Sequence, residues 1–90
     1  LPTALIEGLL LDKFIICSDC PTGPREILDN GKAGILVPVG DARSFADAII
    51  NLMGDKELQT RIKQGIEAHK HVFTFEDTYT QFKNLITELA

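Results

Sequence analysis

Hydrophobic residues recur at helical spacing in four stretches of this chain and form two short continuous runs between the first two stretches. In residues 1–12, Leu5, Ile6, Leu9 and Leu10 make one apolar stripe along a predicted helix. A proline in its first turn costs nothing, because the amide hydrogen that proline lacks has no partner there. The helix is expected to stop near residue 12, an aspartate that tolerates a left-handed cap better than most residues.

The two continuous apolar runs are residues 14–18 and 34–38. Short uninterrupted runs rich in β-forming residues are typical of strands covered on both faces, as in a parallel sheet. Two prolines and a glycine in residues 19–24 predict a loop, and Pro24 begins a short predicted helix. Residues 29–31, Asp-Asn-Gly, predict a turn that uses positive φ. Strands separated by a helical crossover indicate an α/β fold with parallel strands.

Three further helices are predicted after the second strand. Asp41 and Asp55 are placed to cap the first two of them, and Gly54 separates these two helices. Their apolar positions are Phe45, Ala48, Ile49 and Leu52 in the first, and Leu58, Ile62, Ile66 and His69 in the second. A capping box at 74–77 predicts a third helix that runs to the end of the chain.

The start of the first predicted helix is a candidate anion site. The amides of Thr3, Ala4 and Leu5 have no partner inside the helix and point out of its positive end. They could bind an anion such as a diphosphate. Glu7 lies one turn after Thr3 on the same face, where its carboxylate could accept from a pair of sugar hydroxyls. An ordinary buried helix with one solvent-facing glutamate explains the same residues.

Three motifs occur in a specific order: Leu-Pro-Thr-Ala-Leu-Ile-Glu from residue 1, Asp-Cys-Pro-Thr-Gly-Pro-Arg-Glu-Ile-Leu from residue 19, and Gly-Ile-Leu-Val-Pro-Val-Gly-Asp from residue 34. Together they resemble the nucleotide-sugar half of a retaining GT-B glycosyltransferase of the group 1, family 4 type. That family carries two glutamates separated by seven residues. Glu7 matches the second glutamate, and the first would precede Leu1.

The resemblance implies the C-terminal portion of a Rossmann-like GT-B domain, with short parallel strands, flanking helices and a helical C-terminus. Residues 1–90 would then be a partial nucleotide-sugar-binding domain. A sequence that begins without methionine also suggests a fragment. The rest of the sheet is expected to come from segments that this chain does not contain.

The resemblance also implies site residues. The amides of Thr3 and Ala4 would bind the diphosphate of a nucleotide-sugar donor, and Glu7 would bind the ribose. Gly23 and Glu26 would lie near the donor sugar or diphosphate, although a turn with a solvated ion pair is the alternative interpretation of their loop. No catalytic residue and no metal ligand is expected in this fragment, which by itself should be inactive.

The implied activity is transfer of the sugar, with retention, to a glycan or lipid-linked acceptor bound by an N-terminal domain, in bacterial polysaccharide biosynthesis. No cofactor is expected, since the nucleotide sugar is a substrate and the family's chemistry is generally independent of metal. The protein would be cytoplasmic, with peripheral membrane attachment through the N-terminal domain as an option. A sugar-nucleotide epimerase of the same fold and a non-catalytic assembly module that self-associates are alternatives.

Composition narrows the function classes. The net charge of −4 argues against binding to nucleic acid or an anionic membrane surface. The 90 residues are 44% hydrophobic and 24% charged, which indicates a packed globular chain. No apolar run is long enough to span a membrane, and the first residues do not resemble a signal peptide.

Cys17 and Cys20 have the Cys-x-x-Cys spacing of redox and zinc motifs. Cys17 falls inside a predicted strand, which favours a buried structural cysteine over a redox centre. His69 and His71, on a distant helix, are not spaced like zinc ligands and are expected to be partly exposed. The sequence does not identify the base, the sugar, the acceptor or the oligomeric state.

Overall fold

The computed structural model describes residues 3–21 and 23–73. The elements in chain order are α1 (Thr3–Leu10), β1 (Ile16–Ser18), α2 (Pro24–Ile27), the 3-10 turn η1 (Asp29–Gly31), β2 (Ile35–Val37), α3 (Ala42–Gly54), α4 (Lys56–His69) and the 3-10 turn η2 (Lys70–Val72). The predicted helix that would start at the 74–77 capping box lies outside the described residues.

The two strands pair in parallel, with Ile16 opposite Ile35 and Ser18 opposite Val37. The predicted α/β class with parallel strands is therefore confirmed. Both strands are shorter than the predicted runs, and every residue of β1 is half-buried. The expectation that this strand is covered on both faces is not met, because the described helices shield it only in part.

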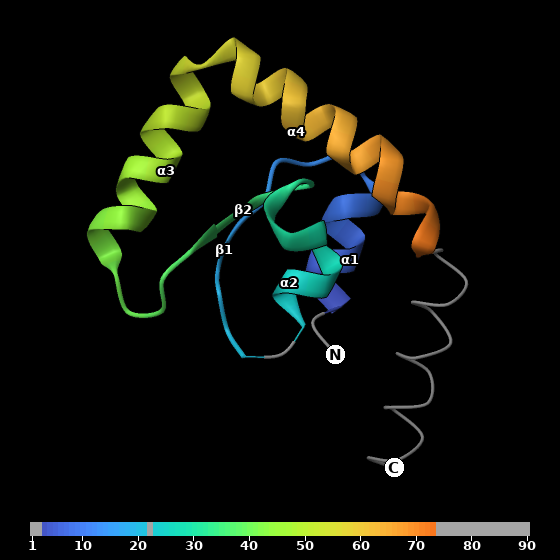
Figure 1. The fold of residues 1–90 in the computed structure, drawn as a ribbon, viewed down its shortest axis with the longest axis horizontal. Helices are drawn as coiled ribbons and strands as arrows, with labels where there is room; N and C mark the ends of the chain where they lie inside the picture. The colour runs from blue at the N-terminus through green and yellow to red at the C-terminus, as the bar shows by residue number, and fades with distance from the viewer. Residues whose placement is uncertain (1–2, 22, 74–90) are drawn as a thin grey trace.

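The helices enclose the strand pair unevenly. In Figure 1 the strands lie between α3 on one side and α1 with α2 on the other, and α4 runs from the end of α3 toward α1. Helix α3 contacts both strands and α4. Helices α3 and α4 thus meet at an angle and border the unit formed by the two strands, α1 and α2.

One continuous hydrophobic core holds these elements together. The fully buried side chains of largest volume are Leu9, Leu28 and Ile66. They belong to a cluster that joins every helix: Ile6, Leu9, Ile27, Leu28, Ala33, Leu52, Ile62 and Ile66. The predicted stripes of α1 and α4 are confirmed by this cluster. In α3 the prediction is wrong for Ile49, which is 41% exposed and lines a hollow together with Ser18 and Pro38.

Local chemistry sets the ends of the helices as the sequence predicts. Asp12 has φ of 58°, and the bonds Asp12 N–H to Leu9 O (3.1 Å) and Lys13 N–H to Gly8 O (2.9 Å) close α1 in a Schellman motif. Asp41 accepts from the amide of Ser44 at 2.9 Å, and Asp55 caps α4 in the same way.

At Gly65, α4 packs closely against the backbone that precedes β2. A Cβ at this position would lie 1.8 Å from the carbonyl oxygen of Lys32 and 3.1 Å from the amide nitrogen of Ala33. Both are backbone atoms just before β2, so only glycine allows the helix to rest there. This close approach brings Ile62 and Ile66 onto the core.

Candidate functional site

The candidate site lies at the edge of the sheet where both strands end. In Figure 1 the described start of α1, residues 19–21 after β1 and the start of α2 all lie at the lower side of the molecule. The carboxyl end of β1 leads directly into that loop. In open α/β sheets, ligands bind outside the carboxyl ends of the strands. Helices α1 and α2 contact each other, and the loop joins β1 to α2, so the predicted site residues come from neighbouring segments.

Helix α1 buries one face and leaves Glu7 exposed on the other. Ile6 and Leu9 are 2% and 0% exposed, whereas Ala4 and Glu7 are exposed. Thr3 begins the helix, so the amides of its first turn have no partner within it. The alternative interpretation, an ordinary buried helix with one solvent-facing glutamate, fits the same exposures, and the side chain of Glu7 is open to solvent.

The loop after β1 is held by a bidentate ion pair. The Arg25 guanidinium donates from Nε and Nη2 to the two carboxylate oxygens of Asp19, at 2.8 and 2.7 Å. These hydrogen bonds lower the pKa of Asp19 and raise that of Arg25. Sequence reasoning anticipated an ion pair in this loop without naming its partners. Fork geometry makes such a pair more directional than a single contact.

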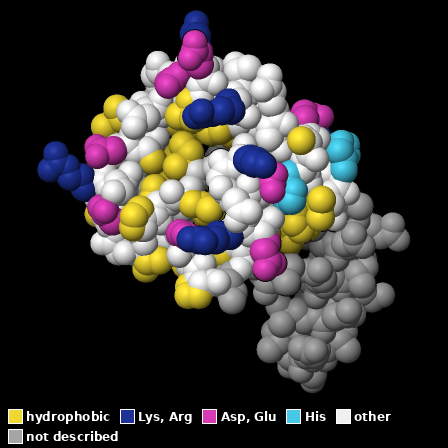
Figure 2. All heavy atoms as spheres, in the orientation of Figure 1, with side chains coloured by type: hydrophobic (Ala, Val, Ile, Leu, Met, Phe, Trp, Pro, Cys, Tyr) yellow, Lys and Arg dark blue, Asp and Glu magenta, His cyan; other side chains and the backbone are white. Residues whose placement is uncertain are grey.

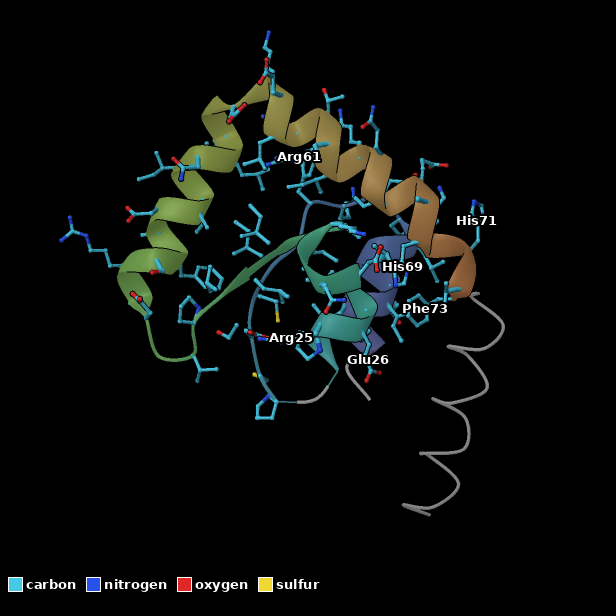
Figure 3. All side chains as sticks on the ribbon, in the orientation of Figure 1. Arg25, Glu26, Arg61, His69, His71 and Phe73 are labelled. Atoms are coloured by element: carbon cyan, nitrogen blue, oxygen red, sulfur yellow. The ribbon has the colours of Figure 1, made fainter. Side chains whose placement is uncertain are left out.

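Gly23 and Glu26 lie at either end of the first turn of α2. Gly23 is the N-cap of α2 and has a φ of 99°, a backbone conformation that residues with a side chain rarely adopt. Glu26 is exposed, and Figure 3 shows its side chain pointing toward the lower edge of the molecule. The structure thus places both secondary candidates beside the start of α2, at the predicted edge.

The backbone of Glu26 has a partner that sequence reasoning missed. The carbonyl oxygen of Glu26 lies 2.9 Å from Nε2 of His69, which comes from the last residue of α4. The His69 ring also makes an edge-on contact with Phe73, with ring centroids 5.7 Å apart. The available signal was the helical spacing of His69 after Ile62 and Ile66. His71, in contrast, is exposed, as expected.

A large hollow of the described surface lies elsewhere. It has a volume of about 920 Å³ and lies between α3, α4 and the start of β2, with Arg61, Asp47 and Lys32 among its polar residues. Figure 2 shows hydrophobic side chains at the bottom of the hollow in the visible face of the molecule. A smaller hollow of about 430 Å³ lies at the carboxyl ends of both strands and includes Ser18 and Pro38. Neither hollow is lined by Ala4, Glu7, Gly23 or Glu26.

The two cysteines of the Cys-x-x-Cys spacing differ in their surroundings. Cys17 is half-buried in β1 and Cys20 is exposed, and both are free thiols. Burial, with a smaller contribution from Cys20, raises the pKa of Cys17, whereas a reactive thiol needs a lowered one. Within residues 3–21 and 23–73, no group of three or more His, Cys, Asp or Glu could hold a metal ion.

Comparison with known proteins decides the family. Residues 1–69 match the family described as glycosyl transferases, group 1. The chain belongs to this family. The group 1 glycosyltransferase match includes all the elements that meet at the candidate site, from α1 to β2, together with α3 and α4.

Of three similar proteins, one is named a phosphotransferase and two are named glycosyltransferases. The chain is 34% identical over 89 residues to an exopolysaccharide phosphotransferase of Streptomyces coelicolor, covering 99% of this chain and 9% of the relative. It is 31% identical over 115 aligned residues to an uncharacterized glycosyltransferase of Methanocaldococcus jannaschii, covering 96% and 28%. A lipopolysaccharide core biosynthesis glycosyltransferase of Rhizobium meliloti is 38% identical over 42 residues, 47% of this chain and 12% of that protein.

The chain therefore spans between 9% and 28% of the length of these three relatives. No solved structure matches it significantly. Among the described residues, no helix has the length and apolar character required to span a bilayer.

Proposed function

We propose that this chain is the donor-binding part of a larger glycosyltransferase that uses a nucleotide-diphosphate sugar. The first-turn amides of Thr3 and Ala4 bind the diphosphate, where the positive end of α1 stabilises its charge. Glu7, one turn further along the same face, binds the ribose hydroxyls. Gly23 and Glu26 border the donor sugar or diphosphate from the neighbouring loop.

The observation that carries this proposal is the position of α1. Its first turn and the start of α2 lie on the same side of the molecule in Figure 1, and α1 contacts α2. Glu7 is exposed while Ile6 is buried, so its carboxylate is accessible to a ligand. Family membership adds the substrate class, because sugar transfer requires an activated donor.

We further propose a GT-B architecture and transfer with retention at the anomeric carbon, as in family 4. The names of two relatives, one for exopolysaccharide and one for lipopolysaccharide core, support a glycan or lipid-linked acceptor. The acceptor would bind a domain other than this one. Helix dipole and basic side chains would stabilise the leaving diphosphate without a metal ion. The chain itself supplies donor contacts and no general acid or base.

The test is a pair of matched substitutions in the whole protein. Glu7→Gln removes the charge but keeps the size, and a charge-assisted hydrogen bond is worth about 1.5–3 kcal/mol. Affinity for the preferred one of uridine, guanosine and adenosine diphosphate should therefore fall about 10- to 100-fold by titration calorimetry. The control is Glu57→Gln, an exposed glutamate in the first turn of α4, which should leave affinity unchanged. Equal affinity of the Glu7→Gln variant and the parent protein would remove Glu7 from the site.

A further inference from the structure

Two adjacent residues at the end of α4 hold both helices of the proposed site. His69 Nε2 lies 2.9 Å from the carbonyl oxygen of Glu26, in α2. The next residue, Lys70, places Nζ 3.0 Å from a carboxylate oxygen of Asp12, directly after α1. These contacts join positions 43 and 58 residues apart in the sequence. Figure 3 shows the His69 side chain directed from α4 toward α2, while His71 points away from it.

The direction of the His69 hydrogen bond follows from its partner. A backbone carbonyl can only accept, so Nε2 must carry the hydrogen. The bond matters because α2 has only four residues. Its turn is held by the bonds from Ile27 N–H to Gly23 O (3.0 Å) and from Leu28 N–H to Pro24 O (2.9 Å). A helix this short has little stability of its own and depends on tertiary contacts.

Lys70 contacts the C-terminal end of α1, as His69 contacts the C-terminal end of α2. Asp12 is the left-handed residue that closes α1, and the Lys70 ammonium pairs with its carboxylate. A positive charge near the C-terminal end of a helix is favourable to its dipole. Glu67 binds the same ammonium at 2.6 Å and keeps it oriented. These two hydrogen bonds raise the pKa of Lys70, so it remains charged.

We propose that His69 and Lys70 are positioning residues that fix α1 and α2 relative to each other. His69 and Lys70 hold the C-terminal ends of α2 and α1. The N-terminal ends of these two helices carry the proposed donor contacts. Donor affinity then depends on the end of α4, which lies outside the site itself. This dependence rests on the proposed function, whereas the ordering of α2 by His69 does not.

The side chain of His69 permits a matched pair of variants. In His69→Gln the amide nitrogen can occupy the place of Nε2 and keep the donor, whereas in His69→Asn it matches Nδ1 and cannot reach Glu26. Lys70→Met removes the contact to Asp12 while keeping the length of the side chain. His71→Asn, at an exposed position two residues further on, is the control.

Hydrogen exchange measured by mass spectrometry in the whole protein reports the ordering of α2. In His69→Asn, exchange of the peptide covering residues 23–28 should be about tenfold faster, while residues 35–37 in β2 stay as protected as in the parent. His69→Gln should restore slow exchange, and His71→Asn should change nothing. Unchanged exchange in His69→Asn, or an equal rise in residues 23–28 and 35–37, would overturn the ordering of α2 by this bond.

Calorimetric titration with the preferred nucleoside diphosphate tests the link to the site. We expect His69→Asn and Lys70→Met each to weaken binding several-fold and His69→Gln to restore it. Normal affinity in both weakened variants, with Glu7→Gln impaired, would refute the positioning role and leave the proposed function standing. If Glu7→Gln also binds normally while exchange in residues 23–28 rises, the donor site is refuted and the ordering of α2 by His69 is supported.

Discussion

The close packing of Gly65 against the backbone of Lys32 makes a strong prediction about stability. Substituting Gly65→Ala would place a methyl group 1.8 Å from the carbonyl oxygen of Lys32 and 2.5 Å from its carbonyl carbon. Ordinary contacts begin at 3.4 Å, so α4 or the segment before β2 would have to retreat by about 1.6 Å. Neither partner is a flexible side chain. The retreat would lift Ile62 and Ile66 from the core that they share with Leu28.

Two opposing effects set the magnitude. Alanine is the better helix former and would favour α4 by about 1 kcal/mol. Overpacking against well-packed neighbours costs about 1–3 kcal/mol and more when backbone must move. Since this overlap is between backbones, we expect the upper end of that range and a net loss of at least about 2 kcal/mol. For a domain whose total stability is about 5–15 kcal/mol, such a loss is large.

Urea unfolding followed by circular dichroism measures this effect, and Gly54→Ala provides the control. Gly54 ends α3, and a Cβ there would meet nothing within 4 Å. That variant should be unchanged or more stable by up to about 1 kcal/mol, because alanine restricts the unfolded chain. The two substitutions have the same chemistry and opposite expected signs. A Gly65→Ala protein as stable as the parent would refute the close approach of α4 to Lys32.

Two further predictions concern titration and reactivity. Hydrogen bonds from Ser44 to Asp41 and from Arg25 to Asp19 lower the pKa of both carboxyl groups below their usual 3.8. The two carboxylates therefore contribute fully to stability above pH 3.8, and this contribution is lost as the pH falls through their lower pKa values in the folded state. Below about pH 4, the urea midpoint of Asp41→Asn should consequently fall less than that of the parent protein. Burial raises the pKa of the Cys17 thiol, whereas Cys20 is exposed. Mass spectrometry after brief iodoacetamide treatment at neutral pH should therefore find the label on Cys20. Equal labelling of the two thiols would contradict the burial of Cys17.

The family and the local elements could be predicted from the sequence because they depend on short-range chemistry. Asp12, Asp41 and Asp55 end or cap helices through contacts with residues at most four positions away. The stripe of α1 follows from helical periodicity, which is also local. The motif order carried the resemblance to group 1 glycosyltransferases, and the family match confirmed it. The roles of Thr3, Ala4, Glu7, Gly23 and Glu26 remain predictions.

Only the tertiary structure decided which distant residues meet. In the sequence, Gly65 is only a residue of low helix propensity inside a predicted helix. Nothing near it in the sequence reveals that Lys32 occupies the space where a side chain would lie. Likewise, His69 contacts a carbonyl 43 residues earlier, and backbone carbonyls leave no sequence signature. Ile49 has the spacing of a core residue and still faces outward. Periodicity gives the faces of a helix, but the partner that covers a face is set by packing between elements far apart in the chain.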